Sequence, residues 1–579
     1  MSMPQRVVPP LIPPRRKRSV ARLSRHSTTA RGMAVLRSPL LNKGTAFTAG
    51  ERRALGLTGL IPSAISTLEA QTRRAYVHYK RLMDPVSQNV YLTALHDRNE
   101  ILFFRLLSEH LREMIPIVND FTVGMAMLQY HHEFRRPRGV YLSIDHPEEI
   151  DAAFANLNIG PDEIDLIVAT DAGLIPGVGD WGVGGIEVPI GKLAIFTAAG
   201  GIDPLRAIPV ILDAGTNCQT LLQDSMYVGN RHARMGGERY DAFIDAYVTA
   251  VTKRFPKAVL SWSDFAPYNG RRILERYRGQ VATFNDDLQG VGAMALAAAT
   301  SASRICGSPL RNQRVVIFGA GMAGISVADE IRDAMVREGL SKADATGRFW
   351  CIDLPGLLTD DMGERLDSRQ MEYARPAAEV RGWKRERAAI DLAEVVQRVR
   401  PTMLIGASGS PGAFTEAIVR EMAAHVERPV VFPLSNPESL SEATPSDLIA
   451  WTDGRALVAA GSSFSPVTYK GITYVIGHVD NAMLYPGLGL GAIVSRARLI
   501  SDDMLVAAAN AVSSLVAVRL PGASLLPRVD NLRTVAMTVA LAVAETAADQ
   551  GLAGVELYDI VRQVQDAMWQ PEYSLLRAL

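Results

Sequence analysis

Hydrophobic residues recur with two different periods along the chain. Between residues 51 and 135 they return every three or four positions, which is the spacing of one face of an α-helix. We therefore predict a helical module whose helices cover 51–57, 64–83 and 90–114. From residue 139 the pattern changes to short β-rich runs that alternate with helical stretches, as is typical of parallel strands joined by crossover helices.

The β-rich runs fall into two series, which indicates two α/β domains after the helical module. The first series covers 140–144, 164–169, 208–212, 259–262 and 281–284, and the second covers 314–318, 348–352, 403–405, 430–434 and 456–459. From about residue 502 the chain returns to helices rich in alanine and valine. The predicted fold class is α/β, with helices at both ends of the chain.

The composition narrows the class of protein without identifying it. With 579 residues, 48% of them hydrophobic and 21% charged, the chain is long enough for several domains and has the make-up of an ordinary globular protein. Its apolar runs are far shorter than the roughly 20 residues of a membrane-spanning helix, so we predict no membrane span. Three cysteines exclude a disulfide scaffold and favour a reducing compartment, for which we expect the cytoplasm.

The net charge of zero combines two unequal parts. Residues 1–50 hold ten basic and no acidic side chains, which leaves 51 basic against 61 acidic side chains in the rest of the chain. We predict a disordered basic tail over 1–50; the alternative is a transit peptide, which would place the protein in an organellar matrix. Beyond the tail, basic residues are scattered among acidic ones, so no nucleic-acid partner is expected.

Carboxylates follow the predicted strands of the first α/β domain. Because the carboxyl ends of parallel strands meet at one edge of a sheet, such side chains can converge on a ligand. Oxygen ligands of this kind suit Mg²⁺ or Mn²⁺, whereas a single Asp after a strand more often caps a helix or starts a turn. We favour a metal or catalytic role for Asp264 with Asp286 and Asp287, and turn chemistry for Asp171 and Asp213.

Lys192 follows a glycine-rich segment, 177–191, and directly precedes a predicted helical stretch over 193–199. A partly desolvated lysine near carboxylates is a tunable base. Most lysines are simply solvated, but this chain has only nine, and this one follows a loop suited to close approach by a ligand.

The second α/β domain carries the fingerprint of a dinucleotide site. The strand 314–318 runs directly into Gly319, Gly321 and Gly324, which precede a helical stretch over 325–338. These glycines allow a tight turn and a close approach of pyrophosphate to the helix N-terminus. Asp353 ends the next predicted strand, where an acid accepts hydrogen bonds from ribose, and no Lys or Arg follows it at once to bind a 2′-phosphate. NAD is therefore favoured, with NADP as the alternative.

Six motifs occur in the order seen in malic enzymes, and the chain resembles that family from about residue 40 to 540. The motifs are FRRPRG at 134–139, GVGD at 177–180, PIGK at 189–192, TFNDDLQG at 283–290, GAGMAG at 319–324 and LSNP at 434–437. The resemblance implies oxidative decarboxylation of malate, a small 2-hydroxy acid, to pyruvate and CO₂. It also implies NAD(P), Mg²⁺ or Mn²⁺, and a homodimer or homotetramer.

The resemblance further implies a subunit of four parts. These are the tail (1–50), the helical module with a malic-type α/β domain (51–290), a Rossmann-like NAD-binding domain (291–545) and a C-terminal helical segment (546–579). By position, Lys192 resembles the family's general base and Asp286 the acid beside it. The other implied assignments are Asp264 and Asp287 as metal ligands, Asn436 and Asn481 as substrate-contacting amides, and Arg206 with Asp287 near the cofactor.

Three positions depart from the family pattern. Asn119 stands where the family has a tyrosine acid, Leu174 where it has a carboxylate-binding arginine, and Ser263 where it has a metal-binding glutamate. Asp120 and Asp480, the latter where the family more often has Asn, are candidates to replace part of what is missing.

These departures leave three hypotheses open. The chain acts on malate, acts on another 2-hydroxy acid whose apolar part faces Leu174, or binds NAD without catalysis. Gln71, Arg74 and Arg98 also resemble positions where some family members bind an activating dicarboxylate, although ordinary surface solvation explains them equally well.

Overall fold

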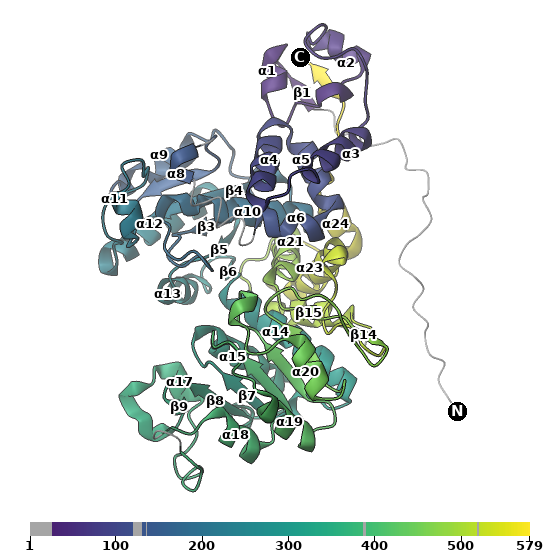
Figure 1. The fold of residues 1–579 in the computed structure, drawn as a ribbon. Helices are drawn as coiled ribbons and strands as arrows, with labels where there is room; N and C mark the ends of the chain where they lie inside the picture. Colours follow the sequence, from purple (N-terminus) through teal and green to yellow (C-terminus); the bar gives the residue numbers. More distant parts are fainter. Residues whose placement is uncertain (1–25, 120–129, 135, 386–388, 518–519) are drawn as a thin grey trace. The chain divides into compact units, whose positions relative to one another are not determined.

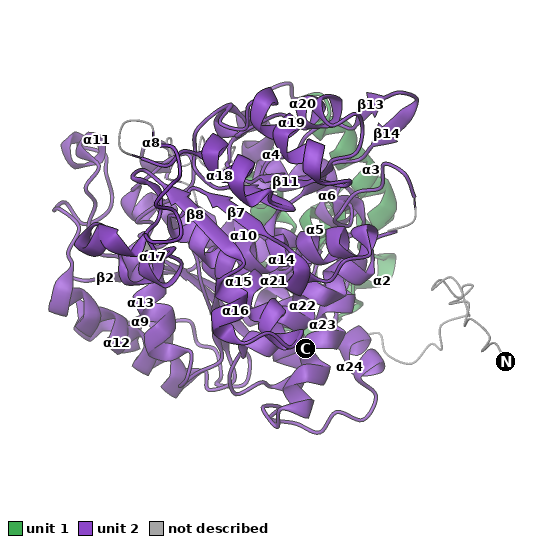
Figure 2. Ribbon diagram, turned by 90° about the horizontal axis from the view of Figure 1, so that it is seen from below, with its two compact units in different colours: residues 1–81, 91–106, 571–579 green, residues 82–90, 107–570 purple. Residues whose placement is uncertain are grey.

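The computed structural model describes residues 26–119, 130–134, 136–385, 389–517 and 520–579. The chain forms two compact units, which Figure 2 shows in different colours. One unit comprises 1–81, 91–106 and 571–579, and the other 82–90 and 107–570. In the part of the chain that is described, no helix is long and apolar enough to span a membrane.

Residues 26–50 are folded, so the prediction of a disordered tail is wrong for this half of it. The strand β1 (His26–Thr28) pairs in parallel with β16 (Leu576–Ala578), which joins the two ends of the chain. Val35 and Phe47 are fully buried beside them. Apolar side chains between the basic residues therefore bury themselves in the smaller unit.

The predicted helices of the N-terminal module are present with different ends. α2 is Ala49–Ala54 and α3 is Leu68–Tyr79. The stretch predicted as one helix over 90–114 is divided among α4 (Pro85–Arg98), α5 (Glu100–Glu109) and α6 (Leu111–Val118). One division falls at Asn99, whose side chain accepts a hydrogen bond from the Leu102 N–H, and the other at His110. Helical periodicity does not reveal such breaks, because the apolar positions continue through them.

Gln71, one of the residues compared with an activator site, is buried in the smaller unit. Its amide donates to the Lys43 carbonyl at 2.9 Å and accepts from the Tyr573 hydroxyl at 2.9 Å. Both polar atoms of the Gln71 amide thus form hydrogen bonds within the protein.

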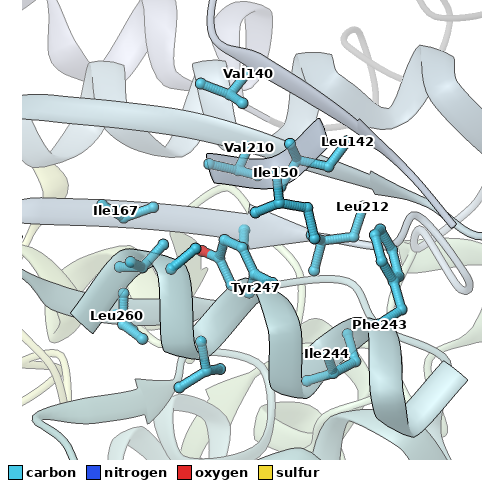
Figure 3. Close-up of a cluster of buried hydrophobic side chains, with 14 of the residues drawn as sticks. Val140, Leu142, Ile150, Ile167, Val210, Leu212, Phe243, Ile244, Tyr247 and Leu260 are labelled. Carbon is cyan, nitrogen blue, oxygen red and sulfur yellow. The ribbon is translucent and has the colours of Figure 1, made fainter. Parts of the chain in front are cut away.

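The first α/β region contains a parallel five-stranded sheet with the order β2-β4-β3-β5-β6. All five predicted strands of this region are present. The strands are β2 (Val140–Ser143), β3 (Leu166–Thr170), β4 (Ala207–Asp213), β5 (Val259–Trp262) and β6 (Thr283–Asn285). Figure 3 shows Leu212, Phe243 and Tyr247 in the core that α12 (Gly237–Arg254) forms against this sheet.

The second α/β region contains a seven-stranded sheet with the order β15-β12-β11-β10-β7-β8-β9, parallel except for β9 (Figure 1). Its strands are β7 (Val315–Phe318), β8 (Phe349–Asp353), β9 (Gly356–Leu357), β10 (Met403–Gly406), β11 (Val430–Pro433), β12 (Leu457–Ala460) and β15 (Gly477–His478). The strand order reverses between β7 and β10, as in doubly wound sheets that bind dinucleotides. The predicted α/β class is confirmed.

Glu330 is a half-buried acid on α15 (Met322–Arg337), the helix that follows the fingerprint. Its stem packs against the backbone of α14 (Leu288–Cys306), since a Cβ at Gly292 would lie 2.8 Å from Glu330 Cγ. Burial, and secondarily the charges of Asp502 and Asp333, raise the pKa of Glu330 to about 8. The ionised form is thus unfavourable in the folded protein.

Replacing Glu330 by Gln should stabilise the protein at pH 8 and leave its stability at pH 4 unchanged. The carboxyl ionises near 4.5 in the unfolded chain but near 8 in the fold, so the native protein loses stability as the pH rises between these values. Because the side chain is only half-buried, solvent weakens this effect, and we expect a gain of about 2 kcal/mol at pH 8, measured by urea unfolding. Glu364→Gln, at an exposed position, is the control. An equal gain at both pH values would show that charge is not the cause.

Candidate active site

A cavity of about 730 Å³ lies where the carboxyl ends of the five-stranded sheet meet the start of α15. Asp264 follows β5, Asp287 follows β6, Met322 and Ala323 begin α15, and all four residues line the cavity. The predicted metal site and the dinucleotide fingerprint therefore border one space, which has the size of a ligand site.

Two of the strand-end aspartates meet, and two others have local partners. Because β5 and β6 are neighbours, Asp264 and Asp287 come together, and the Asp264 N–H donates to the Asp287 carboxylate at 2.5 Å. Asp171, after β3, instead accepts from a backbone N–H and from the Tyr240 hydroxyl. Asp213, at the end of β4, accepts from two backbone N–H groups. The carboxylates of Asp171 and Asp213 therefore stabilise turns and local structure, which is the role that the sequence favours for them.

Lys192 completes the cluster from α10 (Glu187–Ala198). Its ammonium donates to Asp286, donates to Asp287 at 3.0 Å and lies 3.9 Å from the Asp264 carboxylate. The prediction that Lys192 stands near the start of a helix is wrong. The helix already begins at Glu187, and Lys192 lies in its buried interior.

The buried charges in this cluster perturb one another. Burial, followed by the charge of Asp287, raises the pKa of Asp264 to about 8 and that of Asp286 to about 7. Burial by itself would lower the pKa of Lys192, but the three carboxylates outweigh it and hold that pKa well above its usual range. Lys192 is therefore protonated, and Asp286 can gain or lose a proton near neutral pH. Such a pair is suited to proton transfer.

The cluster fits a divalent cation in charge and in donor type. Three carboxylates face one ammonium, and Asp286 Oδ1 is buried without a hydrogen-bond partner. Asp264 also holds a left-handed φ of 52°, a strain often found at functional sites. Within the described residues, no three His, Cys, Asp or Glu side chains already form a metal-holding group, and the Lys192 ammonium lies among the aspartates instead.

The glycines of the fingerprint are required for steric reasons. A Cβ on Gly319, which has a φ of 95°, would lie 2.5 Å from the backbone of Ala407 in the loop after β10. A Cβ on Gly324 would lie 2.1 Å from the Gly319 carbonyl oxygen. Gly321 precedes the first turn of α15 and has open space at its Cβ position, so the helix N-terminus is accessible to a phosphate. This geometry supports the dinucleotide interpretation.

Asp353 ends β8, as predicted, and its carboxylate is held in place by Gln370 of the short helix α17 (Ser368–Glu372). Gln370 donates to Asp353 at 2.9 Å and also to the carbonyl of Ala320 in the fingerprint at 3.1 Å. Gln370 thus connects the pyrophosphate turn with the expected ribose acceptor. In the sequence this glutamine belongs to a helix capping box with Asp367, a pattern that does not point to a cofactor.

Glu442 is a second residue that the sequence does not reveal. Its side chain is fully buried and accepts from the backbone N–H and hydroxyl of Ser408, at 2.8 and 2.9 Å, and from the hydroxyl of Ser435 at 2.5 Å. Ser408 follows β10, and Ser435 follows β11 beside Asn436. One carboxylate therefore fixes two loops at the carboxyl edge of the seven-stranded sheet.

Replacing Glu442 by Ala should raise the dissociation constant for NAD about 10-fold, because the buried donors of Ser408 and Ser435 lose their shared acceptor and the loops lose their fixed geometry. Fluorescence titration with NAD measures this. Glu438→Ala, at an exposed position in the same loop, is the matched control. Unchanged NAD binding in the Glu442 variant would contradict the prediction.

Two of the three departures from the family pattern face the cavity. Asn119 and Leu174 line it, whereas Ser263 is fully buried and is not among its described lining residues. The Ser263 hydroxyl donates to the Asp264 carboxylate at 3.1 Å. Ser263 therefore orients a candidate ligand and does not itself face the site. Gly191 allows the end of α6 to approach Lys192, since a Cβ there would lie 2.3 Å from the Val118 carbonyl oxygen.

The remaining substrate candidates also line the cavity. They are Asn436, Asn481 and Asp480. The Asn481 amide donates to the Asp286 carbonyl at 3.1 Å, and Asp480 caps the turn that carries Asn481. The structure thus brings residues from both sheets to one site.

Arg206 is not brought to this site. It precedes β4, at the amino edge of the five-stranded sheet, where its guanidinium pairs with Asp165 at 2.5 Å. A contact with a cofactor in the cavity does not follow from this position. Asp120 lies outside the described residues.

Comparisons with known proteins agree over nearly the whole chain. The family model described as "Malic enzyme, N-terminal domain" matches residues 96–278, and "Malic enzyme, NAD binding domain" matches 288–548. NAD-dependent malic enzyme 3 of Bacillus subtilis (strain 168) is 56% identical over 554 residues, which cover 95% of this chain and 98% of that protein.

Two further comparisons show the breadth of the similarity. The malolactic enzyme of Lactiplantibacillus plantarum is 44% identical over 543 residues, covering 94% of this chain and 98% of that protein. The crystal structure of malic enzyme from Pyrococcus horikoshii Ot3 has the same fold, with a TM-score of 0.53 and 23% identity over 73% of this chain and 86% of that one.

Proposed function

The chain belongs to the malic enzyme family, and we propose that it oxidises a small 2-hydroxy acid with NAD, followed by loss of CO₂ where the acid, like malate, carries a β-carboxylate. The observation that carries this proposal is the placement of Lys192 among Asp264, Asp286 and Asp287, in the cavity that also reaches the start of the fingerprint helix.

Lys192 takes the proton of the substrate hydroxyl as the C2 hydride leaves. It must first lose its own proton, and Asp286, which contacts it and has a pKa raised to about 7, is the acceptor at hand. The negative charges of the aspartates raise the pKa of Lys192. A divalent cation bound by them would offset these charges and lower that pKa. Where CO₂ is lost, the two residues then return the proton to the carbon that carried the β-carboxylate.

Asp264 and Asp287 are the residues that would hold Mg²⁺ or Mn²⁺. A divalent cation there supplies positive charge that lowers the pKa of the substrate hydroxyl and stabilises negative charge on the oxygen after decarboxylation. Ser263 keeps the Asp264 carboxylate oriented, and Asn481 and Asn436 offer amides to the substrate carboxylate.

For the cofactor, Gly321 and the N-terminus of α15 receive the pyrophosphate, and Asp353 receives the ribose hydroxyls. NAD supplies the hydride acceptor. Because Asp353 would repel a 2′-phosphate, NAD is preferred over NADP. We place the NAD-binding domain at 291–545 and the malic-type domain within 51–290. We also propose a homodimer or homotetramer in the cytoplasm, in agreement with three free cysteines.

The test is NAD reduction by the purified protein with malate and Mn²⁺, followed at 340 nm, with pyruvate measured as the product. Excess EDTA should abolish the reaction and Mn²⁺ should restore it. NADP in place of NAD should lower the rate. If no 2-hydroxy acid reduces NAD although NAD binds, the protein is a non-catalytic NAD-binding member of the family and the proposal is wrong.

A further inference from the structure

The loop 171–180, which follows β3, forms part of the cavity lining, and we refer to it as the cavity loop. Its residues from Leu174 to Gly179 line the cavity. The backbone groups of Ile175 and Gly179 exchange hydrogen bonds at 2.9 and 2.8 Å, which folds the loop back on itself. The Leu174 N–H donates to the Asp264 carbonyl at 3.3 Å. The position of this loop therefore affects the space for a substrate and the backbone of a candidate metal ligand.

Arg234 joins the two ends of the cavity loop. It precedes α12 and is not among the described residues that line the cavity. Its guanidinium donates to both carboxylate oxygens of Asp180, at 3.0 and 2.7 Å, and to the carbonyl of Asp171 at 2.9 Å. It also lies 3.6 Å from the Asp171 carboxylate. One side chain thus binds the first and last residues of the loop, with a fork of donors that lysine does not have.

The pair of Arg234 and Asp180 is shielded from water and fully hydrogen-bonded. The side chain of Arg234 is 8% exposed and that of Asp180 is 16% exposed. Burial by itself would raise the pKa of Asp180, but the hydrogen bonds and charge of Arg234 hold that pKa below its usual value. Asp180 also accepts from the Thr216 hydroxyl at 2.9 Å and the Asn217 N–H at 2.8 Å, both in the loop after β4. A satisfied polar network of this kind fixes one geometry of the segments that it joins.

We propose that Arg234 is a positioning residue for the reaction of malate: it fixes the cavity loop that borders the substrate, without lining the cavity itself. This inference rests on the proposed function and adds a residue to the same site. The reacting groups lie on other elements, Lys192 on α10 and Asp286 after β6. Loss of the Arg234 contacts should therefore weaken malate binding more than it slows the chemical step.

The test is Arg234→Lys, which keeps the buried positive charge but cannot reach Asp180 and Asp171 together. With NAD and Mn²⁺, KM for malate should rise about 10-fold, since hydrogen bonds to charged groups are lost. The value of kcat should stay within about 3-fold and the dissociation constant for NAD within about 2-fold. A folding defect by itself would instead lower kcat and leave KM unchanged, because it only reduces the amount of active enzyme.

Arg231→Lys is the matched control, because this arginine lies in the same segment and also makes three hydrogen bonds. It donates to the carbonyls of residues that are not among the described lining residues, namely Asp224, Ser225 and Tyr227. Its replacement should leave KM, kcat and NAD binding unchanged.

A second variant keeps the test valid if Arg234→Lys does not fold. Asp180→Asn removes the paired acceptor from the other side of the contact and should also raise KM for malate about 10-fold. An unchanged KM in the folded variants, or an equal rise in Arg231→Lys, overturns the inference and leaves the proposed function in place. Failure of the native protein to oxidise malate overturns both.

Discussion

Replacing Lys192 by Met should lower kcat for NAD reduction by about 10³-fold, with the dissociation constant for NAD unchanged within 2-fold. General acid–base groups contribute about 10²- to 10⁴-fold, and Lys192 is the group placed to take the hydroxyl proton. The fingerprint glycines that receive the cofactor belong to a different segment, so binding and turnover should separate. Stopped-flow and steady-state kinetics at 340 nm, with parallel NAD titrations, measure both quantities.

Two further variants decide why activity is lost. Lys192→Arg keeps the positive charge among Asp264, Asp286 and Asp287 but cannot lose its proton, so it should be as inactive as Lys192→Met. Lys257→Met removes a half-exposed lysine paired with Asp162 and should behave as the native protein. Substantial activity in Lys192→Arg would show that the charge of this residue matters and its proton does not.

Replacing Asp264 by Asn should raise the Mn²⁺ concentration required for half-maximal activity by at least about 100-fold. Changes to groups that merely orient a metal ligand typically weaken metal binding 10- to 100-fold, so loss of a ligand charge should exceed that range. Activity titrations with Mn²⁺ and direct binding of Mn²⁺ measured by electron paramagnetic resonance provide two independent measurements.

Ser263, the residue before Asp264 in the chain, provides the control. Ser263→Ala removes the hydroxyl that donates to Asp264 and leaves the carboxylate itself, so its effect on Mn²⁺ should be smaller, about 10-fold. Asp264→Asn also removes one of three crowded negative charges, so its melting temperature in EDTA should not fall. A lower melting temperature together with unchanged Mn²⁺ binding would argue for a structural role and against a metal ligand.

The secondary structure was largely predictable from the sequence, for a local reason. Strands buried on both faces of a parallel sheet form nearly continuous apolar runs, and for this reason β5 was predicted with the bounds that the structure shows. The fingerprint was equally predictable, because the φ of Gly319 and the close contact at Gly324 depend on neighbouring residues. Helix boundaries were less predictable, as Lys192 and the break at Asn99 show, since periodicity passes through them.

The site was predictable only in part. Sequence order could name Asp264, Asp286 and Asp287 together, but it could not exclude Asp171 and Asp213, which follow strands in the same way. The sheet order β2-β4-β3-β5-β6 sets Asp213 apart, because β4 is not a neighbour of β5. Asp171 follows β3, which does pair with β5, and it is set apart by its hydrogen bonds to the Gly173 N–H and the Tyr240 hydroxyl. Local patterns did not connect Glu442 and Gln370 with the site, because Glu442 reaches Ser408, 34 residues away, and Gln370 reaches Ala320, 50 residues away.

The sequence by itself thus determined the α/β class, the dinucleotide turn and the list of groups capable of acid–base and metal chemistry. These features depend on residues close together in the chain, where periodicity and steric limits operate. The tertiary structure alone decided that Lys192 lies among the aspartates, that Arg206 lies at the opposite sheet edge, and that residues 26–50 are folded. It also brought Asn119 and Leu174 to the cavity that Lys192 and Asp264 line, since strand order and helix packing fix which distant segments share a surface.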